Sequence, residues 1–165
     1  MAISKKILKY LEDNKYKYEV VEHKTTYTAW DTAQTEKIKP QEVAKALILK
    51  IDNDYALALV PANRNLDKKK LLGIINAARK KAKLKACKKI DFAKEAWMKK
   101  NIPGKVGATP PFAKVLKINI YIDSLLAKNK RIYLGSGEYT LSIRVSTNQY
   151  LKVEKPVKGN FSVKK

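Results

Sequence analysis

Two runs rich in aliphatic residues, 45–51 and 55–60, flank the short polar segment Asp52-Asn53-Asp54. This pattern predicts a β-hairpin, because Asn and Asp favour the tight turns that join antiparallel strands. Side chains alternate between the two faces of a strand, so Lys45 begins a face that is otherwise apolar. The residues that share this face with Lys45 are Leu47, Leu49 and Ile51. The chain is therefore expected to build a sheet with one cation at the open end of an apolar row.

The length of the hairpin loop decides which residues pair across the two strands. With a three-residue loop, Ile51 pairs with Tyr55, Leu47 lies across from Leu59, and Lys45 lies opposite Pro61. A two-residue loop changes these pairs, but it leaves Lys45 on the same face as Leu47.

The remaining sequence alternates between helical and strand patterns, which predicts a mixed α/β fold. Helical segments are expected at residues 3–14, from Thr28 as a helix cap, at a turn beginning with Pro40, after Asp67, at 91–100 and at 146–151. Strands are expected at residues 16–22, 118–122, 131–134 and 139–145, and a glycine- and proline-rich loop at 101–111.

The chain has 165 residues, 36 of them Lys or Arg against 15 Asp or Glu, and a net charge of +21. This length favours one domain, expected at residues 1–155, followed by a frayed basic tail at 156–165. The charge favours a polyanionic partner, with nucleic acid first and an anionic membrane surface second. The N-terminal segment lacks the apolar core of a signal peptide, and no apolar run is long enough to span a membrane. A cytoplasmic location is the expectation.

Several common chemistries are excluded or weakened by composition and motif. One cysteine, Cys87, excludes an internal disulfide, and one histidine, His23, makes a His- or Cys-based metal site unexpected. Neither a phosphate-binding G-x-x-x-x-G-K-S/T loop nor a G-x-S-x-G elbow is present. Gly135-Ser-Gly137 lacks the third glycine of a dinucleotide fingerprint. The sequence therefore predicts neither a metal nor a cofactor.

Six short motifs together resemble the YbaK / prolyl-tRNA synthetase-associated editing domain family. Their order and spacing match over residues 3–153, and the resemblance is closest to the free-standing members. The motifs are Val21-Glu-His23-Lys-Thr-Thr-Tyr27-Thr28-Ala29, Val43-Ala-Lys45-Ala-Leu-Ile-Leu49, Leu59-Val-Pro61-Ala, Val106-Gly107-Ala-Thr-Pro110-Pro111-Phe112, Ile120-Tyr121-Ile-Asp123 and Gly137-Glu-Tyr-Thr-Leu-Ser-Ile143.

The resemblance implies a YbaK-like fold, with a partly barrel-like β-sheet surrounded by helices. It also implies hydrolysis of the ester of mischarged aminoacyl-tRNA without a cofactor, and a transient association with an aminoacyl-tRNA synthetase. The strand lysine that marks the family's site matches Lys45. Residues expected to bind substrate are Tyr27, Thr28, Gly107, Ala108, Thr109, Pro110, Ser136, Gly137 and Tyr139. Many relatives carry histidine where this chain has Tyr139, which bears on the amino acid removed and on the strength of the activity.

An aminoacyl ester is already activated, so a site need only place water, stabilise the oxyanion and hold the terminal adenosine. We hypothesise that Lys45 binds the terminal phosphate or the ester electrostatically, and that it is not a nucleophile. His23, at a strand end, is interpreted as a structural or rim residue. Trp30 and Trp97 are interpreted as core residues of helix faces, and Thr140, Ser142 and Arg144 as the solvent side of a strand.

The segment 79–89 carries seven cations and no acidic residue. This density favours contact with an RNA backbone, which would position the substrate without reading its sequence. The seven residues are Arg79, Lys80, Lys81, Lys83, Lys85, Lys88 and Lys89.

A trans-acting aminoacyl-tRNA deacylase is the preferred function. The alternative is a nonenzymatic RNA-binding module that kept the fold and lost turnover, and an anionic-membrane-associated protein ranks third because the helices lack a concentrated aromatic and basic face. Alanine, proline, cysteine and serine esters all remain open as substrates, as do the identity of the tRNA and the oligomeric state.

Overall fold

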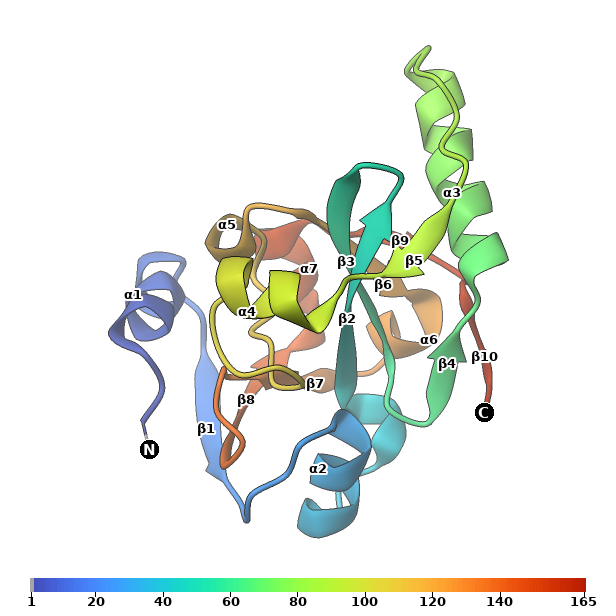
Figure 1. The fold of residues 1–165 in the computed structure, drawn as a ribbon. Helices are drawn as coiled ribbons and strands as arrows, with labels where there is room; N and C mark the ends of the chain where they lie inside the picture. Colours follow the sequence, from blue (N-terminus) through green and yellow to red (C-terminus); the bar gives the residue numbers. More distant parts are fainter. Residues whose placement is uncertain (1) are drawn as a thin grey trace.

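A computed structural model describes residues 2–165 as a mixed α/β fold, which confirms the predicted class (Figure 1). The helices are α1 (Lys5–Asp13), α2 (Ala29–Glu36), the 3₁₀ turn η1 (Pro40–Glu42), α3 (Lys68–Lys81), α4 (Glu95–Asn101), α5 (Ala113–Leu116), α6 (Ser124–Ala127) and α7 (Thr147–Glu154). The strands are β1 (Tyr18–Glu22), β2 (Ala44–Ile51), β3 (Asp54–Pro61), β4 (Arg64–Leu66), β5 (Ile90–Phe92), β6 (Asn119–Asp123), β7 (Arg131–Gly135), β8 (Leu141–Ser146), β9 (Val157–Gly159) and β10 (Ser162–Lys164).

A five-stranded sheet in the order β5-β2-β3-β6-β9 divides the core into two parts. One face packs against α3, where Leu49 and Val60 meet Leu71 and Ile75. The other face contributes Ile48, Leu57 and Leu59 to a larger apolar cluster that includes residues of α1 and α7. Both faces are therefore buried, as expected of a sheet that contains parallel pairs such as β3 with β6.

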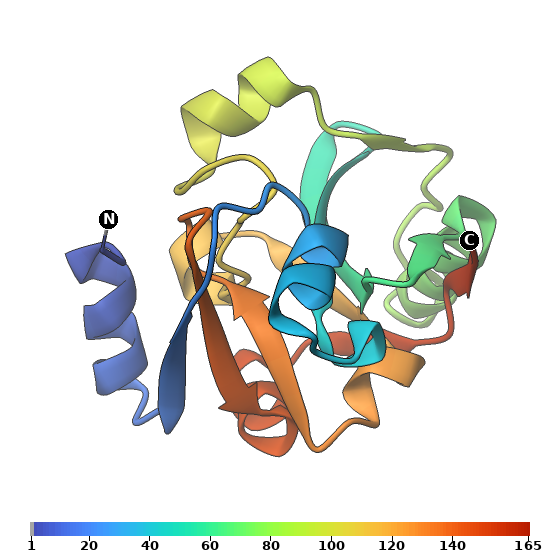
Figure 2. The same cartoon turned by 90° about the horizontal axis from the view of Figure 1, so that it is seen from below.

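A second, three-stranded sheet has the order β1-β8-β7 and is antiparallel. A parallel bridge, Val43 to Tyr133, joins it to the start of β2. Seen from below, α2 lies over the ends of both sheets (Figure 2). Residues Ala33, Val43 and Tyr133 form a small separate core where these parts meet. The sheets are open and do not close into a barrel.

The hairpin lies where the sequence predicts it, but its loop has two residues. Ile51 pairs with Asp54, and Lys45 pairs with Val60, so the three-residue register with Pro61 opposite Lys45 is wrong. Asp52 accommodates the tighter turn with a φ of 53°, a left-handed conformation that Asp tolerates better than most residues. Lys45 does share a face with Leu49 and Ile51, as expected.

The expectation of a frayed tail after Pro156 is wrong. β9 pairs with β6 and β10 pairs with β4, and between them Phe161 is fully buried in the core beneath α3. The buried carboxylate of Asp123 accepts hydrogen bonds from the backbone amides of Phe161 at 2.9 Å and Ser162 at 3.1 Å. The tail is therefore part of the fold, held by the buried ring of Phe161 and by hydrogen bonds to Asp123.

The segment 91–100 also differs from the expectation of a single helix. Ile90–Phe92 is strand β5, paired with β2, and the helix α4 begins only at Glu95. The pairing is long-range, so the local pattern of residues 91–100 does not reveal it.

A buried carboxylate anchors the N-terminal helix. Glu154 accepts hydrogen bonds from the hydroxyls of Tyr10 at 2.8 Å and Tyr16 at 2.6 Å, and from the backbone amide of Ala113 at 2.8 Å. Burial first, and then the hydrogen bond to Glu154, raise the pKa of Tyr16 well above its ordinary value. The hydroxyls therefore stay protonated as donors, and they tie α1 to α7 and α5.

Candidate functional site

Three segments distant in sequence meet at one end of the molecule: residues 26–28, the loop 104–110 and the turn 135–139. The amide of Gly137 donates to the carbonyl of Ala108 at 2.7 Å, and the amide of Lys105 donates to the carbonyl of Gly137 at 2.9 Å. The amide of Thr26 donates to the carbonyl of Tyr139 at 2.9 Å. The three segments thus hold one another through backbone contacts that do not depend on side-chain identity.

Glycine is required at two of these meeting points. Gly107 has a φ of +91°, and a Cβ there would lie 2.2 Å from the carbonyl oxygen of Tyr27. A Cβ on Gly135 would lie 2.5 Å from the carbonyl oxygen of Thr109. Both neighbours are backbone atoms that cannot move aside cheaply, so any larger residue would push the segments apart.

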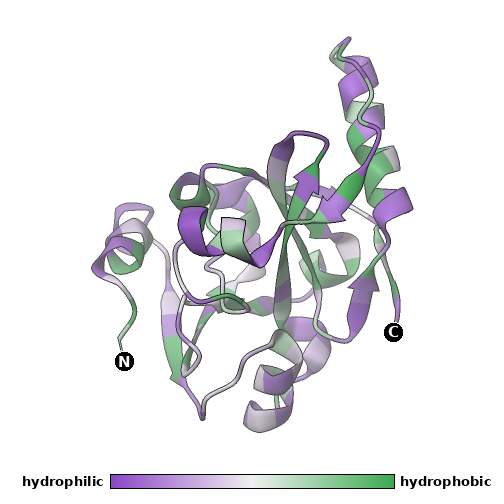
Figure 3. Ribbon diagram, in the orientation of Figure 1, coloured by the Kyte–Doolittle hydropathy of each residue, from purple (hydrophilic) through white to green (hydrophobic). Residues whose placement is uncertain are grey.

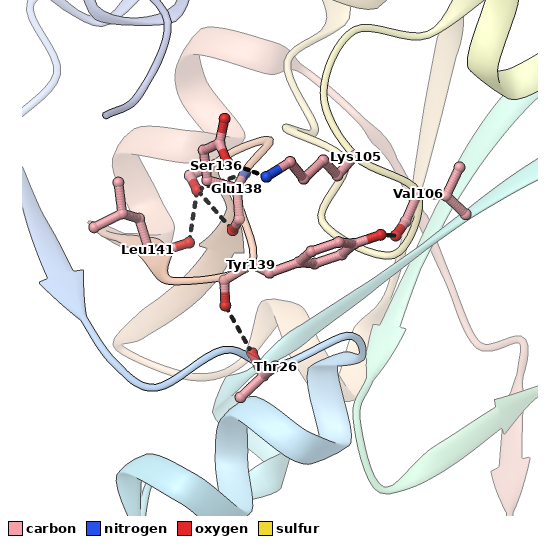
Figure 4. A network of polar contacts seen from close by, with 7 residues as sticks. All are labelled: Thr26, Lys105, Val106, Ser136, Glu138, Tyr139 and Leu141. Atoms are coloured by element: carbon pink, nitrogen blue, oxygen red, sulfur yellow. Dashed lines mark hydrogen bonds and ion pairs between the residues drawn. The ribbon is translucent and has the colours of Figure 1, made fainter. Parts of the chain in front are cut away.

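Tyr139 joins the turn to both other segments (Figure 4). Its hydroxyl donates to the carbonyl of Val106 at 2.6 Å, and its ring meets the ring of Tyr27 edge-on, with centroids 4.8 Å apart. Tyr27 itself is 61% exposed. Tyr139 therefore acts as a latch across the loops.

The turn 135–139 is fixed by two further polar contacts. The hydroxyl of Ser136 donates to the carbonyl of Leu141 at 2.6 Å, and Glu138 forms an ion pair with Lys105 at 2.8 Å (Figure 4). The Lys105 ammonium also lies over the ring of Tyr139, 5.5 Å from its centroid. These contacts link the turn to the 104–110 loop a second time.

A small pocket of about 30 Å³ lies between α2, the start of β2, these loops and the three-stranded sheet. It has room for a water molecule or a group of methyl size. The residues around it are His23, Thr26, Thr28, Ala29, Thr32, Val43, Ala44, Gly107, Ala108, Tyr133, Leu134, Gly135, Glu138, Leu141 and Ser142. The pocket wall combines hydroxyl groups, one imidazole and glycines without side chains. This combination suits a small polar reaction centre.

The substrate residues expected from the sequence divide between this pocket and its surroundings. Thr28, Gly107 and Ala108 line the pocket. Pro110, Ser136 and Gly137 line a second hollow of about 340 Å³, between the same loops and the N-terminal part of α1. Tyr27, Thr109 and Tyr139 belong to the surrounding segments without lining either space.

Sequence reasoning missed a histidine–serine pair on the pocket wall. His23 Nδ1 lies 2.8 Å from the carbonyl oxygen of Lys24, and Nε2 lies 2.9 Å from the hydroxyl oxygen of Ser142. A carbonyl can only accept, so in the neutral imidazole Nδ1 carries the proton and Nε2 accepts from Ser142. Ser142 is only 6% exposed and lines the pocket together with Ala29 and Thr32 of α2, so its assignment to the solvent side is wrong. The arrangement leaves a basic nitrogen and a hydroxyl together beside the pocket.

Lys45 does not line the pocket, although Val43 and Ala44 just before it do. Its side chain is half-buried on the opposite face of β2, where the ammonium donates to the carbonyl of Arg64 and, at 3.4 Å, to Asn65 Oδ1. Burial, and then the charge of Lys165, lower the pKa of Lys45 to about 8. The structure therefore sets Lys45 at the edge between β2 and β4, apart from the glycine loops.

Helix α2 contacts both the pocket and the C-terminal strand. Thr28 caps the helix by accepting from the amide of Asp31 at 3.1 Å, as predicted. Trp30 is 40% exposed, so its interpretation as a core residue is wrong. The ammonium of Lys165 lies 4.5 Å from the centroid of the Trp30 ring. One side of α2 thus faces the pocket and another meets the C-terminal strand.

The seven cations of segment 79–89 lie elsewhere, on the end of α3 and the chain that follows it (Figure 1). They do not line the pocket. Within residues 2–165, no group of three His, Cys, Asp or Glu side chains is placed to hold a metal ion. In the same range, no helix is long and apolar enough to cross a membrane.

Comparison with known proteins identifies the family. The model of the aminoacyl-tRNA editing domain matches residues 23–153, which is most of the chain, so this chain belongs to the aminoacyl-tRNA editing domain family. No match is found among curated protein sequences.

Solved structures agree on the fold. The hypothetical protein APE2540 has a TM-score of 0.80 at 18% identity, over 96% of this chain and 100% of that one. A protein described as a proposed trans-editing enzyme for prolyl tRNA synthetase has a TM-score of 0.80 at 17% identity, over 98% and 99%. A structure from work on epitope backbone grafting has a TM-score of 0.73 at 19% identity, over 95% and 94%. At these identities the similarity establishes the fold alone.

Proposed function

We propose that this chain is an aminoacyl-tRNA deacylase that hydrolyses the ester of a mischarged tRNA. The observation that supports this most is the convergence of residues 26–28, 104–110 and 135–139 around one small polar pocket. These three segments lie within the match to the editing domain. The pocket takes the aminoacyl group, and the ribose stays outside it.

The size of the pocket favours amino acids with small side chains. Its volume of about 30 Å³ accommodates a methyl-sized group, so an alanyl or seryl ester fits better than a prolyl ester. The latch formed by Tyr139 and Tyr27 supports this, because it ties together loops that contribute to the pocket wall.

The chemistry needs a proton acceptor for the attacking water. In the proposed mechanism, water attacks the ester carbonyl and gives its proton to the hydroxyl of Ser142. Ser142 passes its own proton to His23 Nε2, and the leaving ribose oxygen then receives a proton from the imidazolium. The carbonyl of Lys24 supports this role, because it holds Nδ1 as the donor and keeps Nε2 free to accept.

In this proposal Lys45 does not act on the reacting ester. Its ammonium and that of Lys165 are close enough to repel each other, and no carboxylate is paired with either among the ion pairs of residues 2–165. We assign this pair to a phosphate of the single-stranded RNA end, bound on the far side of α2 from the pocket. The exposed ring of Trp30 beside Lys165 offers a surface on which a base can stack.

A panel of tRNAs carrying alanine, serine, cysteine or proline tests the function. We expect rapid ester loss for the smallest side chains, slower loss for proline, and at least about tenfold slower cleavage by His23→Gln. Ester loss is measured by acid-gel separation of charged and uncharged tRNA. Binding of all four tRNAs without ester loss would overturn the proposal in favour of an RNA-binding module without turnover.

A further inference from the structure

A projecting basic element remains outside the proposed reaction. Residues 76–89, here called the basic arm, comprise the second half of α3 and the segment that returns along it. The arm contains seven Lys or Arg residues and no Asp or Glu, and Lys68, Lys69 and Lys70 continue the charge at the start of the helix. Figure 1 shows this end of α3 extending beyond the rest of the fold.

The returning segment is held in place by contacts to its backbone. Asn76 brackets Cys87, donating to its carbonyl at 3.0 Å and accepting from its amide at 2.7 Å. The carboxylate of Asp52, in the hairpin loop, accepts from the amides of Lys88 at 3.1 Å and Lys89 at 2.9 Å. Arg79 donates to the carbonyl of Lys85. The backbone of the arm is thus ordered, and little backbone conformational entropy is lost when the arm meets a ligand.

The cations of the arm remain available to a partner. The lysines of the arm are all exposed, and among the ion pairs of residues 2–165 the arm takes part in one, Lys89 with Asp91 at 3.2 Å. Figure 3 shows the last turn of α3 as hydrophilic. Such a concentration of like charge on an ordered element is electrostatically costly unless an anion offsets it.

The shape and composition of the arm favour double-stranded over single-stranded RNA. The arm contains no Phe, Tyr or Trp, so it lacks the aromatic surfaces on which unpaired bases stack. A straight α3 of fourteen residues is about 21 Å long, which allows several phosphates along a rigid duplex to be contacted at once. Contacts of this kind hold a duplex without reading its sequence.

We propose that the basic arm binds the phosphate backbone of double-stranded RNA, namely the helical part of the tRNA. This inference rests on the proposed function, in which the single-stranded end of the same molecule enters the pocket. Figure 1 places the arm and α2 at opposite ends of the molecule, so the two contacts are spatially separate. The arm supplies affinity for any tRNA, and the pocket supplies the choice of amino acid.

The test compares two variants with the same loss of charge. In the arm variant, Lys80, Lys81, Lys85 and Lys88 are replaced by Gln; in the control, the exposed residues Lys9, Lys114, Lys128 and Lys152 are replaced by Gln. Binding to an RNA hairpin with a fully paired stem is measured at several salt concentrations. We expect the arm variant to bind about tenfold or more weakly, and its dependence on salt to fall by up to about four in log–log slope. The control is expected to change affinity less than about threefold.

Equal losses of affinity for the RNA hairpin in the two variants would overturn the proposal. Tighter binding of the wild type to an unpaired RNA of the same length than to the hairpin would also overturn it. Tighter arm-dependent binding to anionic phospholipid vesicles than to the RNA hairpin would also overturn it. Circular dichroism of both variants confirms that each is folded.

A short aminoacylated CCA oligonucleotide separates this inference from the proposed function. It lacks the duplex, so the arm variant should cleave it at the wild-type rate. If the wild type cleaves no aminoacyl ester at all, the proposed function fails, while the RNA-hairpin result still decides the role of the arm.

Discussion

The pocket and the basic arm are built on opposite principles. The loops around the pocket are held together by backbone contacts: glycines in close approach and amide-to-carbonyl bonds between three segments, which enclose a volume of about 30 Å³. The arm uses backbone only to fix its shape, and it presents long, exposed lysine side chains to solvent. Changes of atomic size should therefore matter at the pocket, and changes of charge should matter at the arm.

Lys45 lies between these two extremes. It is a cation like those of the arm, but it is half-buried and its ammonium is held by a carbonyl. A single well-placed charge near α2 can position one phosphate, whereas the arm can contact several. We therefore expect different responses to mutation at the glycine loops of the pocket, at Lys45 and at the Tyr139 latch.

The largest effect is expected from adding one methyl group to the pocket. In Gly107→Ala, the Cβ would meet the carbonyl of Tyr27 and strain a φ of +91°, so the loops should separate and cleavage should fall by about 100-fold or more. The rate is measured on a short aminoacylated oligonucleotide. Gly73→Ala is the matched control, because a Cβ on that helical residue of α3 meets nothing within 4 Å. It should leave cleavage unchanged and stabilise the helix by about 0.5–1 kcal/mol. Equal activity in the two variants would contradict the account of the glycine loops.

A smaller, pH-dependent effect is expected at Lys45. Its pKa is lowered from the ordinary value of 10.5 to about 8, so the free protein carries this cation below about pH 8 and loses it above. Affinity for a CCA-ended oligonucleotide should fall by up to about tenfold between pH 7 and 9. Lys45→Arg should remove most of this dependence, because Arg stays charged. Binding by fluorescence anisotropy measures both, and the same pH dependence in Lys45→Arg would rule out Lys45 as its source.

The free energy of unfolding gives an independent test of the protonation state of Lys45. Because its folded pKa lies below its unfolded value, charged Lys45 destabilises the fold below about pH 8, and this cost disappears as the pH rises from about 8 to 10.5. Lys45→Met should therefore be more stable than the wild type at pH 7, by about 1 kcal/mol after allowance for partial solvent screening. The difference should shrink at high pH.

The smallest effect is expected at the Tyr139 latch. Tyr139→Phe removes the hydrogen bond to Val106 but keeps the ring against Tyr27, so stability should fall by only about 1 kcal/mol. The looser loops should raise the cleavage of larger esters, such as prolyl esters, a few-fold relative to alanyl esters. Competition between the two esters in one reaction measures the ratio. An unchanged ratio would mean that the latch does not set the size of the pocket.

Local signals in the sequence predicted much of the fold. Thr28 and Asp67 cap the helices that they were expected to cap, and the hairpin lies between the predicted runs. What the sequence could not reveal depends on distant partners. The strand at Ile90–Phe92 exists because β2 is beside it, and the tail is ordered because Phe161 and Ser162 meet Asp123.

The candidate site was predicted only in part. The three segments could be named from the family resemblance, and the structure brings them together. The burial of Ser142 beside His23 could not be foreseen, because it depends on segments distant in sequence that meet around the pocket. Nor does strand alternation show that Lys45 and the pocket lie on opposite faces of β2, since the position of the glycine loops is a tertiary property.

A crystal structure of the protein with an uncleavable amide analogue of an alanylated CCA end tests the central claim most directly. The account predicts that the alanyl methyl lies between Thr32, Ala44 and Ser142, with the scissile carbonyl carbon within reach of a water bound to Ser142. An alanyl group bound anywhere else, with this pocket still closed, would contradict it.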